Sequence, residues 1–270
     1  MPAGADAMSS AEKLDPKPAA ALSLAALSGI PLVKAGDNVA DLIVAGLSAS
    51  GLALQPGDVI AIAQKIVSKA EGRTIDLRGV TPSPRALALA EEVDKDPRLV
   101  ELILTESTEV VRHRKGVLVV AHRNGTVLAN AGIDASNVGG GDESVLLLPQ
   151  DCDRSCRDIR TRLAVRTGIE VGVLIIDSLG RAWRNGTVGA ALGAAGLPAL
   201  LDLRGKPDLF GRTLKSTQVG VADEIAAAAS LLMGQADEGT PVVLVRGLEL
   251  PEREGSAAEL IRARENDLFR

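Results

Sequence analysis

Short apolar runs bounded by turn residues alternate with helical patterns along most of the chain. Four of these runs have the length and the β-branched composition of buried strands: Asp58–Ala63 (DVIAIA), Gly116–Ala121 (GVLVVA), Val171–Ile176 (VGVLII) and Val242–Val245 (VVLV). Asn124-Gly125 predicts a tight hairpin turn from the second run into Thr126–Ala129. The third run ends at Asp177, where we expect its strand to end.

Three further segments have helical patterns. Ser155–Thr167 is amphipathic and is closed by Gly168, and Val219–Met233 is alanine-rich and stops before Gly234. Because hairpin-like and crossover-like connections are both present, we expect an α+β fold with largely antiparallel sheets. We expect a disordered tail over residues 1–20, one catalytic domain over 21–250, and a charged helical extension over 251–270.

The composition narrows the functional classes. Hydrophobic residues make up 46% of the chain and charged residues 24%, as in soluble globular proteins. Trp183, Phe210 and Phe269 are the only aromatic residues, so a base-stacking platform is lacking, and 30 basic against 35 acidic residues leave a net charge of −5. We therefore expect no nucleic-acid partner. No apolar stretch approaches the roughly 18 residues of a membrane span, so we expect no membrane role.

The two cysteines fit a reducing compartment, and we expect a cytoplasmic protein. Cys152 and Cys156 are one helical turn apart, but no histidine is near to complete a zinc site, so we interpret both as structural. His113 and His122 lie in basic stretches with neither an acid nor a serine elbow around them, which argues against a hydrolase triad.

Four glycines, Gly186, Gly189, Gly193 and Gly196, look superficially like a dinucleotide-binding motif. Their intervals of three, four and three residues do not match G-x-G-x-x-G, and several residues separate them from the preceding strand. They favour tight packing of small residues at a helix or subunit contact instead. A P-loop motif is also lacking, so another device would have to hold any nucleoside triphosphate.

The segment Gln64–Arg73 (QKIVSKAEGR) is a candidate for that device because it places basic residues directly after a buried strand. Lys65 and Lys69 would converge if the segment is helical, and two lysines suit phosphate oxygens. The alternative interpretation is a solvated basic turn.

Acidic residues follow two other strands. Asp134, Ser136 and Asn137 offer oxygen donors within four residues, and Asp177-Ser178 repeats the arrangement after VGVLII. Two carboxylates at two strand ends with a hydroxyl beside one of them are suited to a magnesium or manganese phosphate site. The alternative is that each aspartate only stabilises its own turn.

Four arginines occupy two glycine-punctuated stretches, SLGRAWRNG and DLRGKPDLFGR. They suggest recognition of carboxylate or phosphate on a substrate, with ordinary surface charge as the alternative. These substrate-binding candidates are Arg181, Arg184, Arg204 and Arg212.

Several ordered blocks together closely resemble the coenzyme F420:L-glutamate ligase (F420-0:gamma-glutamyl ligase) family over about residues 28–250. These blocks are GIPLVKAGDN, GDVIAIAQKIVSKAEGR, DPRLVELILTES, NAGIDASNV, IIDSLGRAWRNG, DLRGKPDLFGR and ADEIAAAASLLMGQA. The resemblance implies a GTP-dependent ligase that adds L-glutamate through γ-linked amide bonds to the phospholactyl deazaflavin F420-0. It also implies a divalent cation, Mg²⁺ or Mn²⁺, leaves room for a monovalent cation, and predicts a mixed fold that forms an interwoven homodimer.

The resemblance also assigns roles to individual residues. It places nucleotide contacts at Ile30, Pro31, Leu32, Val33, Gln64, Lys65, Lys69, Asn137 and along Met233–Thr240, which includes Gly234 and Gln235. It places metal ligands at Asp134, Asp177, Ser178 and Gln235. Of all these, Asp134, Asp177 and Lys69 are the catalytic candidates.

Two positions depart from the family pattern. Threonine commonly stands at the position of Ser178, which keeps the hydroxyl. Glutamate can stand at the position of Gln235, which keeps an oxygen but loses a negative charge, so the strength or number of metal sites is open.

These residues lead to a hypothesis for the reaction. Lysines and a cation neutralise the triphosphate, a substrate carboxylate attacks the γ-phosphoryl group, and the glutamate amine captures the acyl phosphate. Two alternatives stay open at the level of sequence. One is a glutamate ligase acting on another carboxylated cofactor such as a pterin, and the other is a non-catalytic sensor that binds a nucleotide or a deazaflavin.

Overall fold

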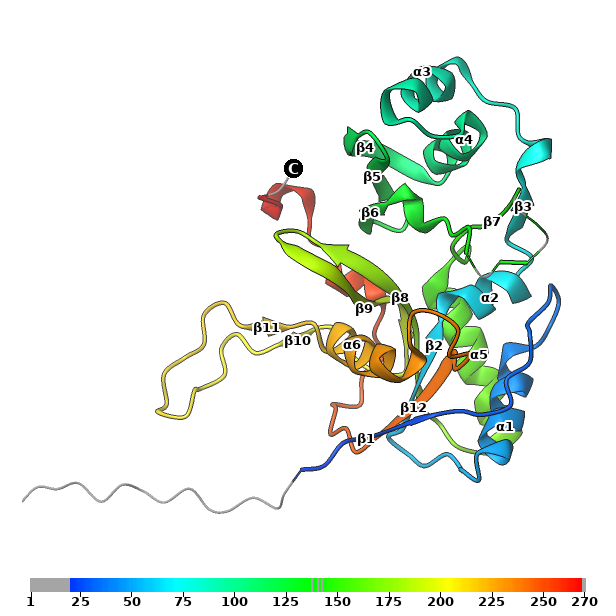
Figure 1. Cartoon of the computed structure of the whole chain (residues 1–270). Coiled ribbons are helices and arrows are strands. Elements are labelled where there is room, and N and C mark those ends of the chain that lie inside the picture. The colour runs from blue at the N-terminus through cyan, green and yellow to red at the C-terminus, as the bar shows by residue number, and fades with distance from the viewer. Residues whose placement is uncertain (1–19, 137, 140, 142, 269–270) are drawn as a thin grey trace, which may run out of the picture.

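The computed structural model describes residues 20–136, 138–139, 141 and 143–268. The tail predicted for residues 1–20 therefore lies outside the described residues except for Ala20. The described part has a main body built on a five-stranded sheet, a smaller lobe above it and a long projecting arm (Figure 1). None of its helices is both long and apolar enough to cross a membrane.

The central sheet has the strand order β1-β12-β2-β8-β9. The strands are β1 (Ser23–Ala26), β12 (Val242–Arg246), β2 (Val59–Ala63), β8 (Gly172–Arg181) and β9 (Arg184–Ala195). β2 and β8 are parallel and all other neighbours are antiparallel. This arrangement confirms the predicted α+β class with mostly antiparallel pairing.

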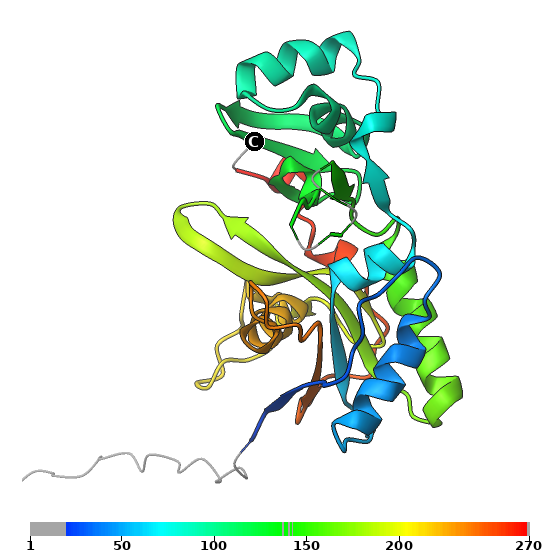
Figure 2. The ribbon, with the colours of Figure 1, turned by 45° about the vertical axis from the view of Figure 1, so that its right-hand side comes forward.

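Helices cover both faces of this sheet (Figure 2). Helices α1 (Val39–Ala49) and α5 (Cys152–Thr167) pack on one face and α6 (Val221–Met233) on the other. Successive residues of β2 alternate between the two cores, with Ile60 and Ile62 on the α1 and α5 side and Val59 and Ala61 on the α6 side. A strand buried on both faces is apolar throughout, which is why its sequence reads as a continuous run.

The smaller lobe has its own core. Two helices, α3 (Pro84–Val93) and α4 (Pro97–Thr105), pack against the antiparallel strands β4 (Ser107–Arg114), β5 (Val117–His122) and β6 (Val127–Ala129). The predicted hairpin at Asn124-Gly125 is confirmed as the turn between β5 and β6. Strand β3 (Thr74–Asp76) pairs with β7 (Ser144–Leu146), and the short η1 (Leu77–Gly79) follows β3.

Strand β8 corrects one sequence prediction. It does not end at Asp177 but runs on to Arg181 and turns back as β9, so Asp177 and Ser178 pair with Ala190 and Gly189 inside a long hairpin. The small residues of β9 allow this because helices pack closely over them. A Cβ on Gly189 would lie 2.4 Å from the Ala226 carbonyl oxygen of α6, and one on Gly193 would lie 2.5 Å from the Cys152 backbone of α5. The predicted packing against a helix is confirmed for Gly189 and Gly193, whereas a Cβ on Gly186 would have no atom within 4 Å.

The C-terminal segment also differs from its prediction. In place of a helix, residues 251–268 contain two 3-10 turns, η3 (Ala257–Leu260) and η4 (Arg264–Asn266). Side-chain contacts hold each turn against the rest of the protein: Glu259 pairs with Arg253 and accepts from the Leu200 amide, and Arg264 pairs with Glu109 of β4. These contacts fix a path over the surface that a continuous helix would not follow.

The projecting arm joins β10 (Leu201–Asp202) to β11 (Gln218–Val219), which pair only with each other (Figure 1). The predicted helices before and after it are confirmed with small shifts. Helix α5 begins three residues earlier than expected, at Cys152, because Asp151 caps it, and α6 begins at Val221.

Candidate active site

Helix α2 (Gln64–Ala70) begins immediately where β2 ends. Ala63, the last residue of β2, pairs in parallel with Ile176 of β8, so the start of α2 lies beside Asp177. The segment is helical, which was the condition for its two lysines to converge, and Lys65 and Lys69 are one turn apart. Burial, and then the nearby charge of Lys65, lower the pKa of Lys69.

Asp134 reaches the same place from the smaller lobe. It follows η2 (Asn130–Gly132), where three successive residues have positive φ and turn the chain sharply. The backbone of Asp134 exchanges two hydrogen bonds with Leu146, at 3.0 and 2.8 Å, and this bridge continues the β3-β7 pairing. Its side chain forms an ion pair with Lys65. The lysine and aspartate segments, predicted separately, therefore meet.

Asp177 is the second carboxylate of the site. Burial, and then the negative charge of Asp134, raise the pKa of Asp177 to about 7, while the Ser178 amide and Lys65 oppose the shift. The Ser178 amide donates to Asp177 Oδ1 at 2.8 Å. A buried carboxylate with a second carboxylate near it forms a site that favours a bound cation.

The loop after α6 completes the group. The Ser178 hydroxyl donates to Gln235 Oε1 at 2.5 Å, so two further candidate metal ligands are in contact. Thr240 Oγ1 closes this loop by donating to the Leu232 carbonyl at 2.8 Å. The Ala63 amide at the end of β2 donates to Pro241 at 2.8 Å, which places Met233, Gly234 and the rest of the loop next to α2.

The Ile30–Val33 segment lies between β1 and α1. It approaches the end of α2, where the Gly36 amide donates to the Ala70 carbonyl at 2.9 Å. Within this segment Pro31 and Leu32 are exposed and Val33 is buried in the main core. Asn137, the remaining nucleotide candidate, lies outside the described residues.

The four candidate arginines are not part of this cluster. Arg181 and Arg184 flank the tip of the β8-β9 hairpin, and Arg204 and Arg212 lie in the arm. All four are exposed, and Arg204 pairs with Asp202 of the arm itself. Within the described residues no contact joins any of them to Asp134 or Asp177. The structure therefore does not bring these arginines to the candidate metal ligands of their own chain, and their role in substrate binding stays a prediction.

The donor set can be tested against a divalent cation. Asp134, Asp177, Ser178 and Gln235 supply only oxygen, which is the donor that Mg²⁺ and Mn²⁺ prefer. The described residues contain no group of three or more His, Cys, Asp or Glu side chains placed to hold a metal ion. Two carboxylates, a hydroxyl and an amide thus fit a cation that takes few protein ligands and completes its coordination shell with water or phosphate.

Sequence reasoning missed a set of buried polar residues around α2. Glu106 is only 4% exposed and pairs with Arg73 at 2.7 Å and Arg123 at 2.9 Å. Arg73 follows α2 and also donates to the Leu148 carbonyl at 3.0 Å, so this buried pair ties α2 to the smaller lobe. Arg73 was visible in the QKIVSKAEGR block, but nothing in sequence links it to Glu106, 33 residues away.

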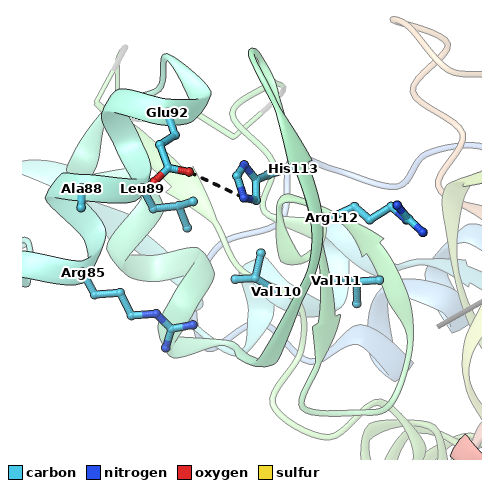
Figure 3. A pocket seen from close by; sticks show the side chains of 8 residues that line it. All are labelled: Arg85, Ala88, Leu89, Glu92, Val110, Val111, Arg112 and His113. Atoms are coloured by element: carbon cyan, nitrogen blue, oxygen red, sulfur yellow. Dashed lines mark ion pairs between the residues drawn. The ribbon is translucent and has the colours of Figure 1, made fainter.

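A groove lies away from these residues, between α3 and β4 (Figure 3). Its volume is about 650 Å³, and Glu92 and His113 point toward one another across it at 3.7 Å while Arg112 points away. None of the candidate site residues lines it, and its charged groups lie on the surface of the lobe. Cys152 and Cys156 are buried free thiols, and burial raises the pKa of Cys152 to about 12, consistent with a structural role.

Comparison with known proteins adds an independent observation. The profile of the family described as F420-0:Gamma-glutamyl ligase matches residues 29–247. Proteins named coenzyme F420:L-glutamate ligase are similar over nearly their whole length. The one from Methanothermobacter thermautotrophicus is 49% identical over 92% of this chain and 99% of its own. The one from Methanopyrus kandleri is 49% identical over 88% and 93%, and the one from Archaeoglobus fulgidus 44% identical over 90% and 94%.

Proposed function

The chain belongs to the F420-0:gamma-glutamyl ligase family, and from this premise we propose that it joins L-glutamate to the phospholactyl deazaflavin F420-0 at the expense of GTP. The observation that carries the proposal is the meeting of Lys65, Asp134 and Asp177 where β2 ends beside the middle of β8. A polyanionic nucleotide needs basic groups and a cation in one place, and these residues supply both.

The proposed reaction has two steps. A carboxylate oxygen of F420-0 attacks the γ-phosphorus of GTP, the bond from that phosphorus to the bridging oxygen breaks, and GDP leaves with the electron pair. The glutamate amine then attacks the acyl carbon, loses a proton and expels inorganic phosphate as the amide forms. The acyl phosphate links the free energy of GTP cleavage to amide formation.

The basic residues of α2 support the first step. Lys65 and Lys69 bring two positive charges to one side of a short helix, where they bind the phosphate oxygens and stabilise the charge that develops on them. The Ile30–Leu32 stretch, with Pro31 and Leu32 exposed, and the loop from Met233 to Thr240 lie near the two ends of α2, where they would enclose the nucleotide.

Asp134, Asp177, Ser178 and Gln235 hold the divalent cation. When bound, the cation neutralises triphosphate charge and polarises the γ-phosphoryl group. Because Gln235 is neutral, it contributes an oxygen without charge, and the two aspartates carry the electrostatic part of cation binding.

We also propose that the protein acts as a homodimer. Trp183 at the β8-β9 tip is 87% exposed and Phe210 in the arm is 82% exposed, so aromatic side chains that normally avoid water lie on projecting parts of the chain. A second copy would bury them. The arm projects away from the body of its own chain (Figure 1) and carries Arg204 and Arg212, so it would also bring these arginines to the second copy.

The test is incubation with GTP, Mg²⁺ or Mn²⁺, L-glutamate and F420-0, followed by mass spectrometry of the acceptor. We expect mass increments of one glutamate, together with GDP and phosphate. Parallel reactions with a pterin acceptor, or without any acceptor, test the two alternative functions, a ligase for another cofactor and a non-catalytic sensor.

Asp134→Ala and Asp177→Ala should each abolish turnover with little change in melting temperature, because each removes charge from the site and no core volume. The exposed Asp158→Ala on α5 serves as the control. Full activity in both site variants would contradict the assignment.

A further inference from the structure

The two carboxylate oxygens of Asp134 have different surroundings. Gln64 Nε2 donates to Oδ2 at 2.7 Å, and the ammonium group of Lys65 also contacts Oδ2. Among the residues that the structure describes, none donates a hydrogen bond to Oδ1. One oxygen of this aspartate is therefore held from within the protein, while the other accepts no hydrogen bond from the part of the chain that the structure describes.

Gln64 is itself held by a serine of its own helix. Its Oε1 accepts a hydrogen bond from Ser68 Oγ at 2.8 Å, one helical turn further along α2. The Asp134 carboxylate, which only accepts, requires the NH₂ end of the amide to face it, and the Ser68 hydroxyl then holds the oxygen end by donating to it. Gln64 is 1% exposed and Ser68 is fully buried, so water does not compete for either group.

The surroundings of Gln64 also bear on its expected role as a nucleotide contact. Both ends of its amide are already bonded within the protein, and its side chain has almost no exposed surface to offer a ligand. A neutral amide is also the donor that can hold Asp134 without adding charge beside Asp177. A second carboxylate at this position would instead repel both aspartates.

We propose that Gln64 is a positioning residue, whose amide, oriented by Ser68, holds Asp134 through Oδ2 and leaves Oδ1 for the divalent cation. This inference rests on the metal site of the proposed function and adds the two residues that orient it. Hydrogen-bond partners of this kind fix the direction of a metal-binding carboxylate, and their loss typically weakens metal affinity about tenfold to a hundredfold.

The test measures binding of Mn²⁺ alone by calorimetric titration, without nucleotide or turnover. Gln64→Met keeps the length of the side chain and removes both polar groups, and it should weaken Mn²⁺ binding about tenfold or more. Ser68→Ala should weaken it less, about threefold to tenfold, because Gln64 can still donate but is no longer oriented. In the double variant the loss should equal that of Gln64→Met alone, since Ser68 acts only through Gln64.

Controls separate this inference from the proposed function. Ser107→Ala removes another hydroxyl bonded within its own chain, at 2.5 Å to the Ile103 carbonyl in the smaller lobe, and should leave Mn²⁺ affinity unchanged. Asp177→Asn should remove binding. If the parent binds no Mn²⁺, or Asp177→Asn binds it equally well, the proposed metal site is wrong.

If Asp177→Asn loses binding while Gln64→Met binds like the parent, the metal site stands and the positioning role is overturned. Additive losses in the double variant overturn the link from Ser68 to Gln64. Melting curves without metal monitor folding. Should Gln64→Met fail to fold, Ser68→Ala alone decides, and an unchanged affinity in that variant overturns the proposal.

Discussion

Glu106 is a carboxylate that the fold buries and basic groups stabilise. Burial opposes its ionisation, but the imidazole of His122 and the charges of Arg73 and Arg123 outweigh burial and hold the pKa of Glu106 below its ordinary value. His122 Nε2 lies 3.7 Å from the carboxylate and is itself fully buried. The ion pairs of Glu106 join α2 to the smaller lobe, so its ionisation state affects the stability of the whole described fold.

This arrangement predicts a specific acid sensitivity. Because the folded-state pKa is lowered, the stabilisation is complete above the ordinary pKa of about 4.3 and is lost as the pH falls through the lower folded-state value. Glu106→Gln should reduce the free energy of unfolding at pH 7 by about 3 kcal/mol, since it leaves two arginines without their buried partner. It should also show a smaller further loss than the parent below pH 4.

Urea unfolding between pH 3 and pH 7 checks this prediction. Glu92→Gln is the matched control, because the Glu92 side chain is 60% exposed and should change stability little. An equal loss of unfolding free energy at low pH in the parent and in Glu106→Gln would show that protonation of Glu106 does not cause the acid sensitivity.

Lys69 is the residue through which the nucleotide proposal can be tested by binding alone. It lies one turn from Lys65 on α2, and its lowered pKa reflects burial and the neighbouring positive charge. A phosphate group would relieve that repulsion. Lys69→Ala should weaken binding of GDP with Mg²⁺ by about 1.5 to 3 kcal/mol, the range for a charge-assisted hydrogen bond.

Calorimetric titration measures this change. Lys115→Ala removes an exposed lysine of the smaller lobe, paired with Asp94 at 3.1 Å, and should bind GDP like the parent. An unchanged dissociation constant for Lys69→Ala would return this lysine to the role of a solvated charge.

At the scale of elements, the site is built where two strands of the central sheet end or bend. Helix α2 starts at the end of β2, and Asp177 lies on the neighbouring strand one position beyond the pairing of Ala63 with Ile176. Strand β9 holds Asp177 and Ser178 from the other side through Ala190 and Gly189. The glycines of β9 therefore matter to the site as well as to the core, because they let α5 and α6 approach the strand that supports it.

Substitutions on the hairpin test this packing. Gly189→Ala and Gly193→Ala would each place a Cβ within 2.5 Å of helix backbone, which cannot move aside as a side chain can. Each should destabilise the protein by about 2 to 3 kcal/mol and lower the melting temperature by roughly 5 to 10 °C. Gly180→Ala, in the same hairpin with no atom within 4 Å of the added Cβ, should melt like the parent. Equal melting temperatures for all three variants would contradict close helix packing.

Much of this framework was readable from the sequence. Strands β2, β8 and β12 are continuous apolar runs because both their faces are buried, and α5 and α6 end at glycines that the pattern marks. The helical spacing of Lys65 and Lys69 also followed from their positions. What the sequence could not show was the length of β8. The pairing of β8 with β9 depends on α5 and α6 packing over the glycines of β9. The local sequence of β8 contains no signal of that contact.

The site could be predicted in part for the same reason. Asp134 and Asp177 each follow a run of residues that is recognisable as a strand, so both could be identified as candidate ligands from the local sequence alone. That Asp134 meets Lys65 and Gln64, about 70 residues away, depends on the β3-β7 pairing that brings the smaller lobe onto α2. The burial of Gln64 and Ser68 and the bond between them depend on the fold, so the positioning role proposed for Gln64 could not be predicted from the sequence, which marked it only as a nucleotide contact.

At the scale of the whole molecule, the projecting arm exposes large apolar side chains to solvent. Leu209 and Phe210 of the arm are 69% and 82% exposed, and the arm strands β10 and β11 pair only with each other. An arm with exposed apolar groups and little support from its own chain is typical of an element that packs on a partner subunit. Arg204 and Arg212 on the same arm would then act at the site of the second copy.

The proposed dimer predicts that Phe210→Asp shifts the protein from twice the chain mass of 27.8 kDa toward the monomer, because a charge replaces the apolar contact on the arm. Light scattering after size-exclusion chromatography measures the mass at several concentrations. Val165→Asp on α5 is the control, since Val165 is 80% exposed but lies on the body of the molecule, away from the arm. If the arm also supplies arginines to the partner's site, ligase activity should fall as the dimer dissociates and recover at high protein concentration. A fully active monomer would show that each chain's site is complete without the arm of the other.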